Sequence, residues 1–131
     1  MAYEISNYSV KVTLVAAASL ADKQYHFVKI DTDGKAAICA GTTDKPIGIL
    51  QNAPAAGEEA EVLVVGGSKL VAGEALDESD AVGTGADARG EALTIGTDTT
   101  RYHVATCILA AGADGEYATV VLNAAAPARA A

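Results

Sequence analysis

Short apolar segments with a period of two recur along this chain, and turns that contain glycine separate them. The clearest segment spans residues 9–16, where Val10, Val12 and Leu14 alternate with polar neighbours. A period of two puts alternate side chains on one face of a β-strand, whereas a helix needs a period of 3.6 residues, which persists nowhere here. Further strands are predicted at residues 25–30, 36–40, 47–50, 59–65, 69–72, 92–95, 102–110 and 116–122. The pattern predicts an all-β fold, a small single-domain β-barrel or β-tulip-like fold with an extended N-terminal arm.

Glycine marks the predicted connections. Asp33-Gly34 and Asp114-Gly115 stand between apolar runs and predict hairpin turns, because glycine tolerates positive φ. Gly66-Gly67 is expected to end the strand at residues 59–65. Residues 77–90 are polar and rich in glycine, which favours a mobile or partner-contacting loop. Residues 102–110 are apolar on both faces, which predicts a strand covered on two sides, and no strict internal repeat is found.

The 131 residues fit one domain, which we divide into an arm at residues 1–8, a β-domain at residues 9–123 and a flexible Ala-rich tail at residues 124–131. Half of the chain is hydrophobic, but it contains one Phe and no Trp. Large aromatic side chains bury the most area per residue. The core must therefore be a tightly spaced small barrel, or else the protomer gains part of its stability from neighbouring molecules.

The net charge of −8 opposes binding to nucleic acid or to an anionic membrane. The acidity favours solubility, and docking onto a basic protein surface is the alternative. No run of apolar residues reaches the length of a membrane span, and the first nine residues do not form a secretory signal.

Few titratable groups are arranged for chemistry. His26 and His103 each lie in a strand pattern without ligand partners, and His103 and Cys107 would be well separated on a strand. Cys39 and Cys107 are predicted to be buried free thiols. We therefore expect no enzyme activity, no cofactor and no metal site.

Two acidic stretches contain oxygen ligands at the close spacing that calcium binding requires. Residues 31–34 begin like a calcium loop, but the closing Glu is missing, so a hairpin turn is favoured. Asp77, Glu78 and Asp80 form an acidic cluster for which a solvated loop is favoured over metal binding. The candidate partner contacts are Met1, Ala2, Tyr3, Glu4, Ile5, Asp77, Glu78 and Asp80.

A series of short motifs resembles the capsid decoration (cement) proteins of tailed bacteriophages. The motifs follow in order as residues 46–50 (Pro-Ile-Gly-Ile-Leu), residues 56–62, the Gly73-Glu74 turn and the Asp114-Gly115-Glu116 turn. The resemblance covers about residues 24–122. It implies a β-barrel or β-tulip-like protein made in the host cytoplasm, with no catalytic residues, that binds the outer surface of the capsid. There it would form homotrimers, or sometimes remain a monomer or dimer, at three-fold or quasi-three-fold sites and stabilise contacts between major capsid proteins.

Two other functions remain open. Residues 73–76 are reminiscent of biotinyl and lipoyl carrier domains, in which Lys69 would be the modified residue at a hairpin tip. A host-binding, fibre-like virion module is the second alternative, with residues 77–90 as its candidate contact loop.

Overall fold

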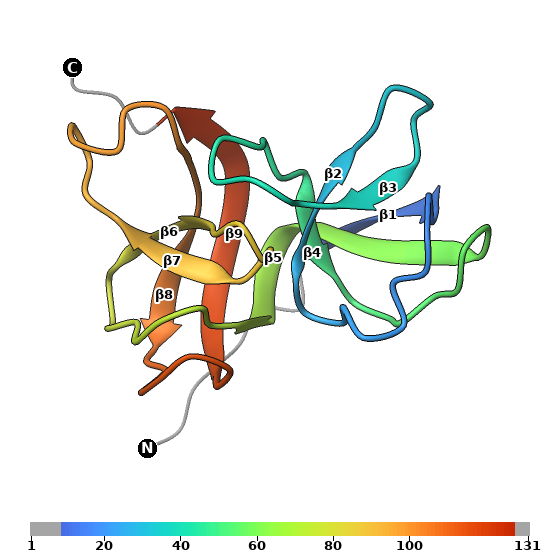
Figure 1. Ribbon diagram of the computed structural model, residues 1–131. Helices are drawn as coiled ribbons and strands as arrows, with labels where there is room; N and C mark the ends of the chain where they lie inside the picture. Colours follow the sequence, from blue (N-terminus) through green and yellow to red (C-terminus); the bar gives the residue numbers. More distant parts are fainter. Residues whose placement is uncertain (1–8, 128–131) are drawn as a thin grey trace.

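The computed structural model describes residues 9–127, and each regular element in that range is a β-strand (Figure 1). The strands are β1 (Val10–Val15), β2 (Phe27–Ile30), β3 (Ala36–Ile38), β4 (Gly48–Leu50), β5 (Glu59–Val71), β6 (Ala81–Thr84), β7 (Gly90–Leu93), β8 (Tyr102–Leu109) and β9 (Tyr117–Pro127). The predicted all-β fold is confirmed. Within the described range, no helix is long and apolar enough to cross a membrane.

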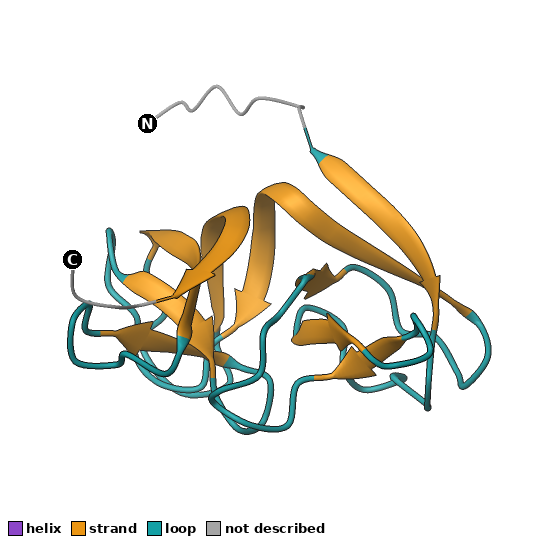
Figure 2. Ribbon diagram, turned by 90° about the horizontal axis from the view of Figure 1, so that it is seen from above, coloured by secondary structure: helices purple, strands orange, loops and turns teal. Residues whose placement is uncertain are grey.

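Strand β5 belongs to two curled sheets at once. Its first part, to Val65, pairs with β1 on one side and β4 on the other, and its second part, from Gly66, pairs with β9. Figure 2 shows this sharply bent strand passing from one group of strands to the other. Gly66 has a φ of 122°, a conformation that favours glycine. The prediction that a strand ends at Gly66-Gly67 was wrong, because the two glycines bend the strand without ending it.

The two halves of the chain have the same topology. Residues 10–65, called unit 1, place their strands in the order β3-β2-β4-β5-β1, and residues 66–127, called unit 2, in the order β7-β6-β8-β9-β5. In each unit a parallel bridge closes the sheet. In unit 1 it joins Ala16, just after β1, to Ala36 of β3, and in unit 2 it joins Ala72, just after β5, to Gly90 of β7. Each sheet therefore curls into a partly closed barrel.

The match extends to register and turn geometry. Val12 pairs with Val62 in unit 1 as Ser68 pairs with Val120 in unit 2. Before β2 and β6, Tyr25 and Ser79 both adopt positive φ, at 64° and 72°, although neither is glycine. Equivalent positions that keep the same residue include Leu14 and Leu70, Ala16 and Ala72, Leu20 and Leu76, Val28 and Val82, Gly57 and Gly115, Glu58 and Glu116, Ala60 and Ala118, and Val62 and Val120. The chain is a structural duplication.

The duplication does not appear as a strict sequence repeat, because the spacing between equivalent positions of unit 1 and unit 2 is not constant. Val28 and Val82 are 54 positions apart, whereas Val62 and Val120 are 58 apart. Loop lengths differ between the units, and the shared residues are mostly Ala, Val and Leu, which are common throughout the chain.

One apolar core joins the two units. Phe27, Ile49 and Leu63 of unit 1 are at most 2% exposed and pack with the interior of unit 2, around Leu70 and Val120. The opposite face of the unit 1 sheet has its own core, made of Ala16, Leu20, Val28, Ala36, Leu50, Ala60 and Val62. Unit 1 is therefore buried on both faces of its sheet, and burying each large aliphatic or aromatic side chain contributes about 1.5–3 kcal/mol.

Two predicted boundaries differ from the structure. Residues 81–84 form β6 inside the stretch predicted to be a loop, because glycine is required by close packing there rather than by a turn. A Cβ atom on Gly83 would lie 2.5 Å from the Tyr102 carbonyl oxygen and 2.9 Å from a Leu93 methyl carbon. Strand β9 extends past the predicted domain end at residue 123, since Tyr102 pairs with Pro127. The rest of the predicted tail lies outside the described residues.

Replacing Gly83 with alanine tests this close packing. We expect Gly83→Ala to lower the free energy of unfolding by about 1–3 kcal/mol, because the new methyl group must displace backbone. The matched control is Gly41→Ala, where a Cβ atom would meet nothing within 4 Å. Urea unfolding of both variants measures the difference, and equal stabilities would contradict the packing described.

Candidate partner-binding surfaces

The acidic cluster predicted as a partner contact or metal site is a hydrogen-bonded turn between β5 and β6. The Asp80 carboxylate accepts the backbone N–H of Asp77 at 2.9 Å, and the Glu78 carboxylate accepts the N–H of Ala110 at 3.4 Å. The Asp80 carboxylate thus closes the turn, and the Glu78 carboxylate ties it to the residue that follows β8. Among the described residues no group of three or more His, Cys, Asp or Glu side chains could hold a metal ion. Asp77 and Glu78 are exposed, so their predicted role as partner contacts stays a prediction.

The other predicted partner contacts, Met1, Ala2, Tyr3, Glu4 and Ile5, lie outside the described residues. Their role as an arm stays a prediction from the sequence.

Both cysteines are buried free thiols, as predicted. Burial raises the pKa of Cys39 to about 12, and the nearby Asp44 carboxylate adds to this effect. Burial also raises the pKa of Cys107, and Asp80 and Glu78 act in the same direction. Because the thiolate is the nucleophilic form, neither cysteine is activated at neutral pH.

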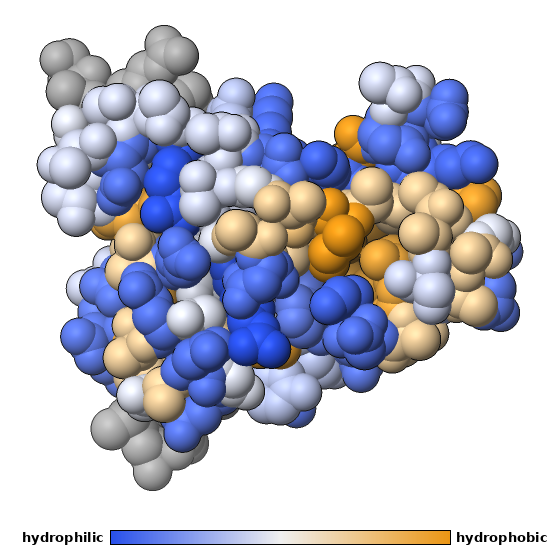
Figure 3. Space-filling view, viewed as in Figure 1, coloured by the Kyte–Doolittle hydropathy of each residue, from blue (hydrophilic) through white to orange (hydrophobic). Residues whose placement is uncertain are grey.

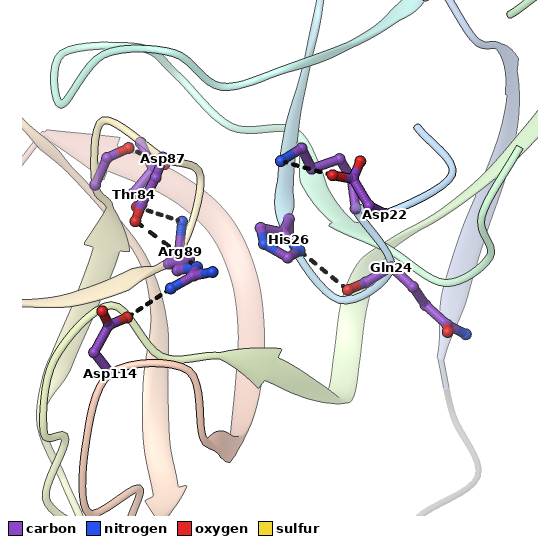
Figure 4. A network of polar contacts seen from close by, with 9 residues as sticks. Asp22, Gln24, His26, Thr84, Asp87, Arg89 and Asp114 are labelled. Atoms are coloured by element: carbon purple, nitrogen blue, oxygen red, sulfur yellow. Dashed lines mark hydrogen bonds and ion pairs between the residues drawn. The ribbon is translucent and has the colours of Figure 1, made fainter. Parts of the chain in front are cut away.

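A polar network lies where unit 1 meets unit 2 (Figure 4). Arg89 binds the Asp114 carboxylate at 2.7 Å, and its Nε lies 3.7 Å from Asp87. On the unit 1 side, the His26 ring Nδ1 lies 3.1 Å from the Gln24 carbonyl oxygen. Burial lowers the pKa of His26, and the charge of Arg89 acts in the same direction. The lowered pKa favours a neutral imidazole at pH 7.

Lys69 does not have the geometry of a carrier lysine. It lies inside β5 rather than at a hairpin tip, and its Nζ is 5.8 Å from the ring centroids of both Tyr25 and Tyr117. The two rings pack edge to face at 5.7 Å. The lysine therefore takes part in a cation–π contact between the units, and the carrier alternative loses its structural basis.

Two apolar surfaces are uncovered within the described chain. The first, called the unit 1 groove, encloses about 600 Å³ and is lined by Val12, Ile30, Lys45, Pro46, Ile47, Val64 and Val65. Figure 3 shows apolar surface gathered over the half of the molecule that contains β1–β4. The second, called the unit 2 face, consists of Ala81, Thr106, Ile108 and Val121 on neighbouring strands of unit 2.

Neither surface is predicted by the sequence, although one sequence feature is related to the unit 2 face. Residues 102–110 predicted a strand covered on both sides. In the structure the neighbouring residues Val104 and Ala105 are both buried, but Ile108 and Leu109 at the end of β8 are 46% and 45% exposed. The prediction was therefore wrong for the end of the strand. An apolar strand face left in water is a candidate surface for binding a partner.

Comparison with known proteins identifies a shared fold. No protein-family model and no curated protein matches the sequence. Among solved structures, the chain is similar to the N base of the head fibre gp8.5 of bacteriophage phi29. The TM-score is 0.65 and the sequence identity is 18%, over 88% of this chain and 95% of that chain. At this identity the likeness establishes the all-β fold and leaves the function to be argued.

Equivalent positions in the two units should respond differently to truncation. Leu63 and Val121 occupy the same register position, but Leu63 is 2% exposed and Val121 is 43% exposed. We expect Leu63→Ala to cost about 2–5 kcal/mol of unfolding free energy in the isolated chain. Val121→Ala should cost about 0.5 kcal/mol or less. Similar losses, measured in dilute solution by denaturant unfolding, would show that Val121 is buried.

The Cys39 thiol should make stability depend on alkaline pH. Its pKa rises from 9.0 in the unfolded chain to about 12 in the folded protein. The folded state therefore favours the protonated thiol, and this contribution is present below pH 9 and lost as the pH rises to 12. Cys39→Ala should have a flatter loss of stability across that range than the wild type. Parallel curves would contradict the assigned pKa.

Proposed function

We propose that this protein is a structural component of a tailed-phage virion that binds the outside of the capsid and stabilises contacts between major capsid proteins. The observation that carries the proposal is the fold that this chain shares, over 88% of its length, with the base of the phi29 head fibre. The order of glycine-based motifs in the sequence resembles capsid decoration proteins and supports the same role. A homotrimer at three-fold or quasi-three-fold sites is part of the proposal.

The arrangement of side chains is consistent with a binding role. The carboxylates of the acidic turn accept backbone N–H groups, and both thiols are buried and protonated. The apolar groove and face described above offer surface for a partner instead. A protein that binds assembled capsids but not free subunits stabilises the assembly by mass action, by about 2.7 kcal/mol per site at a concentration 100 times its Kd.

Co-sedimentation with purified capsids tests the proposal. We expect saturable binding at a fixed ratio to the major capsid protein, and binding to expanded capsids only. Absence of binding to both expanded and unexpanded capsids would rule the proposal out. The bound fraction is read by gel densitometry across a range of protein concentrations.

The acidic turn gives a variant with a matched control. Asp77→Asn/Glu78→Gln removes two exposed charges from the predicted contact, and Asp33→Asn/Glu59→Gln removes two exposed charges from unit 1. If the turn docks on a basic capsid patch, the first variant should bind several-fold more weakly at low salt, with the difference shrinking as salt rises. Equal affinities of the two variants would exclude the turn from the contact.

A host-binding fibre-like module is the second candidate, because the similar structure is described as part of a head fibre. Such a module should bind intact host cells in a pull-down and leave capsids unbound. The two functions are separated by running both binding assays on the same protein preparation.

A further inference from the structure

We propose that a second copy of this chain docks head to tail on the first, with its unit 1 groove against the unit 2 face. The contact repeats, between two chains, the junction that units 1 and 2 make within one chain. The proposal rests on the self-association that the proposed function includes and names the surfaces that make it, but it does not depend on binding to capsids.

The internal junction is built by the first strand and one turn of unit 2. The Val71 backbone N–H, at the end of β5, donates to the Tyr25 carbonyl at 2.9 Å. The Phe27 N–H donates to the carbonyl of Ala88, in the β6–β7 turn, at 2.8 Å. These contacts cover the outer face of the unit 1 sheet.

That covered face has an uncovered counterpart in unit 2. In unit 1 it is a row across the strands, made of Cys39, Phe27, Ile49 and Leu63, each at most 2% exposed. In the same register, unit 2 presents Leu93, Ala81, Thr106 and Val121. Leu93 is buried at one end of this row, but Thr106 is exposed and Val121 is 43% exposed. Within the described chain, nothing covers the unit 2 row as unit 2 covers the unit 1 row.

The surface that unit 2 uses at the junction is covered in unit 2, but the equivalent surface of unit 1 is open. Ser68 and Thr84 of unit 2 are 8% and 2% exposed. By register, Val12 and Ile30 occupy the same positions in unit 1, where they line the open groove. Ile30 is 47% exposed. The unit 1 groove therefore has no partner within the described part of the chain, and neither has the unit 2 face. The two surfaces are equivalent to the two sides of the internal junction.

Side-chain polarity at matched pairs supports this contact. Within the chain, Gln51 Nε2 donates to Ser68 Oγ at 2.9 Å, and the Cys39 thiol is hydrogen-bonded to the Thr84 side chain. Both internal pairs join polar groups to polar groups, which satisfies them where they are buried.

In the proposed contact between two chains, the positions equivalent to Gln51–Ser68 and Cys39–Thr84 are occupied by apolar residues. Leu109 stands opposite Thr119 as Gln51 stands opposite Glu61, and the neighbouring Ile108 is the extra residue of a bulge in β8. Both Ile108 and Leu109 are exposed, and their predicted partner is Val12 of the second copy. Leu93 replaces Cys39, and its predicted partner is Ile30. At the first pair both members change from polar to apolar together, as two side chains that touch each other require; at the second pair Ile30 replaces Thr84 beside the buried end of the row.

The contact has a defined symmetry. The groove and the face are different surfaces, so the contact is heterologous, and its repetition closes a ring or extends a filament. In a closed ring every chain has both surfaces covered, which removes the exposed Ile30, Ile108 and Val121 from water.

Cross-linking of singly substituted chains tests the predicted pair. Chains with Val12→Cys and chains with Ile108→Cys are mixed and treated with a short bismaleimide. We expect a covalent dimer in the mixture and none from either chain alone. The control replaces Ile108→Cys by Ala113→Cys, whose equivalent in unit 1, Ala55, lies in the β4–β5 turn at the end of unit 1 remote from unit 2 (Figure 1). This control mixture should give no dimer.

The mass in solution tests the contact without cross-linking. Light scattering after size exclusion should give the wild type a multiple of the 13.1 kDa chain mass. Ile108→Asp should reduce the mass to one chain with an unchanged circular dichroism spectrum, and Ile108→Val should leave the multimer intact.

Three results would overturn the proposal. One is a wild-type mass of a single chain at every concentration. Another is a multimer that Ile108→Asp does not dissociate. The third is cross-linking from Ala113→Cys as efficient as that from Ile108→Cys.

Discussion

The continuity of β5 through its bend is the constraint on which the rest of the structure depends. A strand that ended at Gly66 would leave two small sheets joined by a tether. Because the backbone ladder continues from β1 and β4 to β9, the orientation of unit 2 on unit 1 is fixed by main-chain hydrogen bonds. The positive φ of Gly66 makes this bend possible without a loop. The shared core around Phe27 and Leu70 follows from that fixed orientation.

The duplication explains why a chain with so few large side chains is stable and yet has uncovered apolar surface. One junction buries Phe27 and Leu63, so a core of small residues gains a second layer. Each unit has two surfaces that can form a junction, and a chain of two units covers only one of them in each unit. The surfaces at the two ends stay open, and Ile30 and Val121 remain in water. The proposed head-to-tail contact corresponds to the second explanation for the Ala- and Val-rich composition, a protomer that gains stability from neighbours.

Much of the fold was predictable because alternation and turn chemistry act locally. The alternation at Val10–Leu14 and the Asp-Gly pairs predicted β1, the β2–β3 turn and the turn before β9 correctly. The failures come from non-local packing. Gly83 is typical of a loop in the sequence, but in the structure a glycine is required there because the Tyr102 backbone lies too close for a side chain. Gly66-Gly67 reads as a strand end, although the paired neighbours on both sides keep the strand continuous.

The candidate site was less predictable than the fold. Exposed acidic residues are conspicuous in sequence, whereas Asp80 proved to hold a turn. Which surfaces stay uncovered depends on the face of unit 1 against which unit 2 packs. That packing cannot be deduced from any single residue. The two-sided apolar character of β8 was the sequence signal, and it needed the duplication to be interpreted.

Electron cryomicroscopy of expanded capsids incubated with the protein tests the central claim most directly. The account predicts added density on the outer capsid surface, at fixed lattice positions, with two similar lobes for each bound chain. Expanded capsids without added density would contradict it.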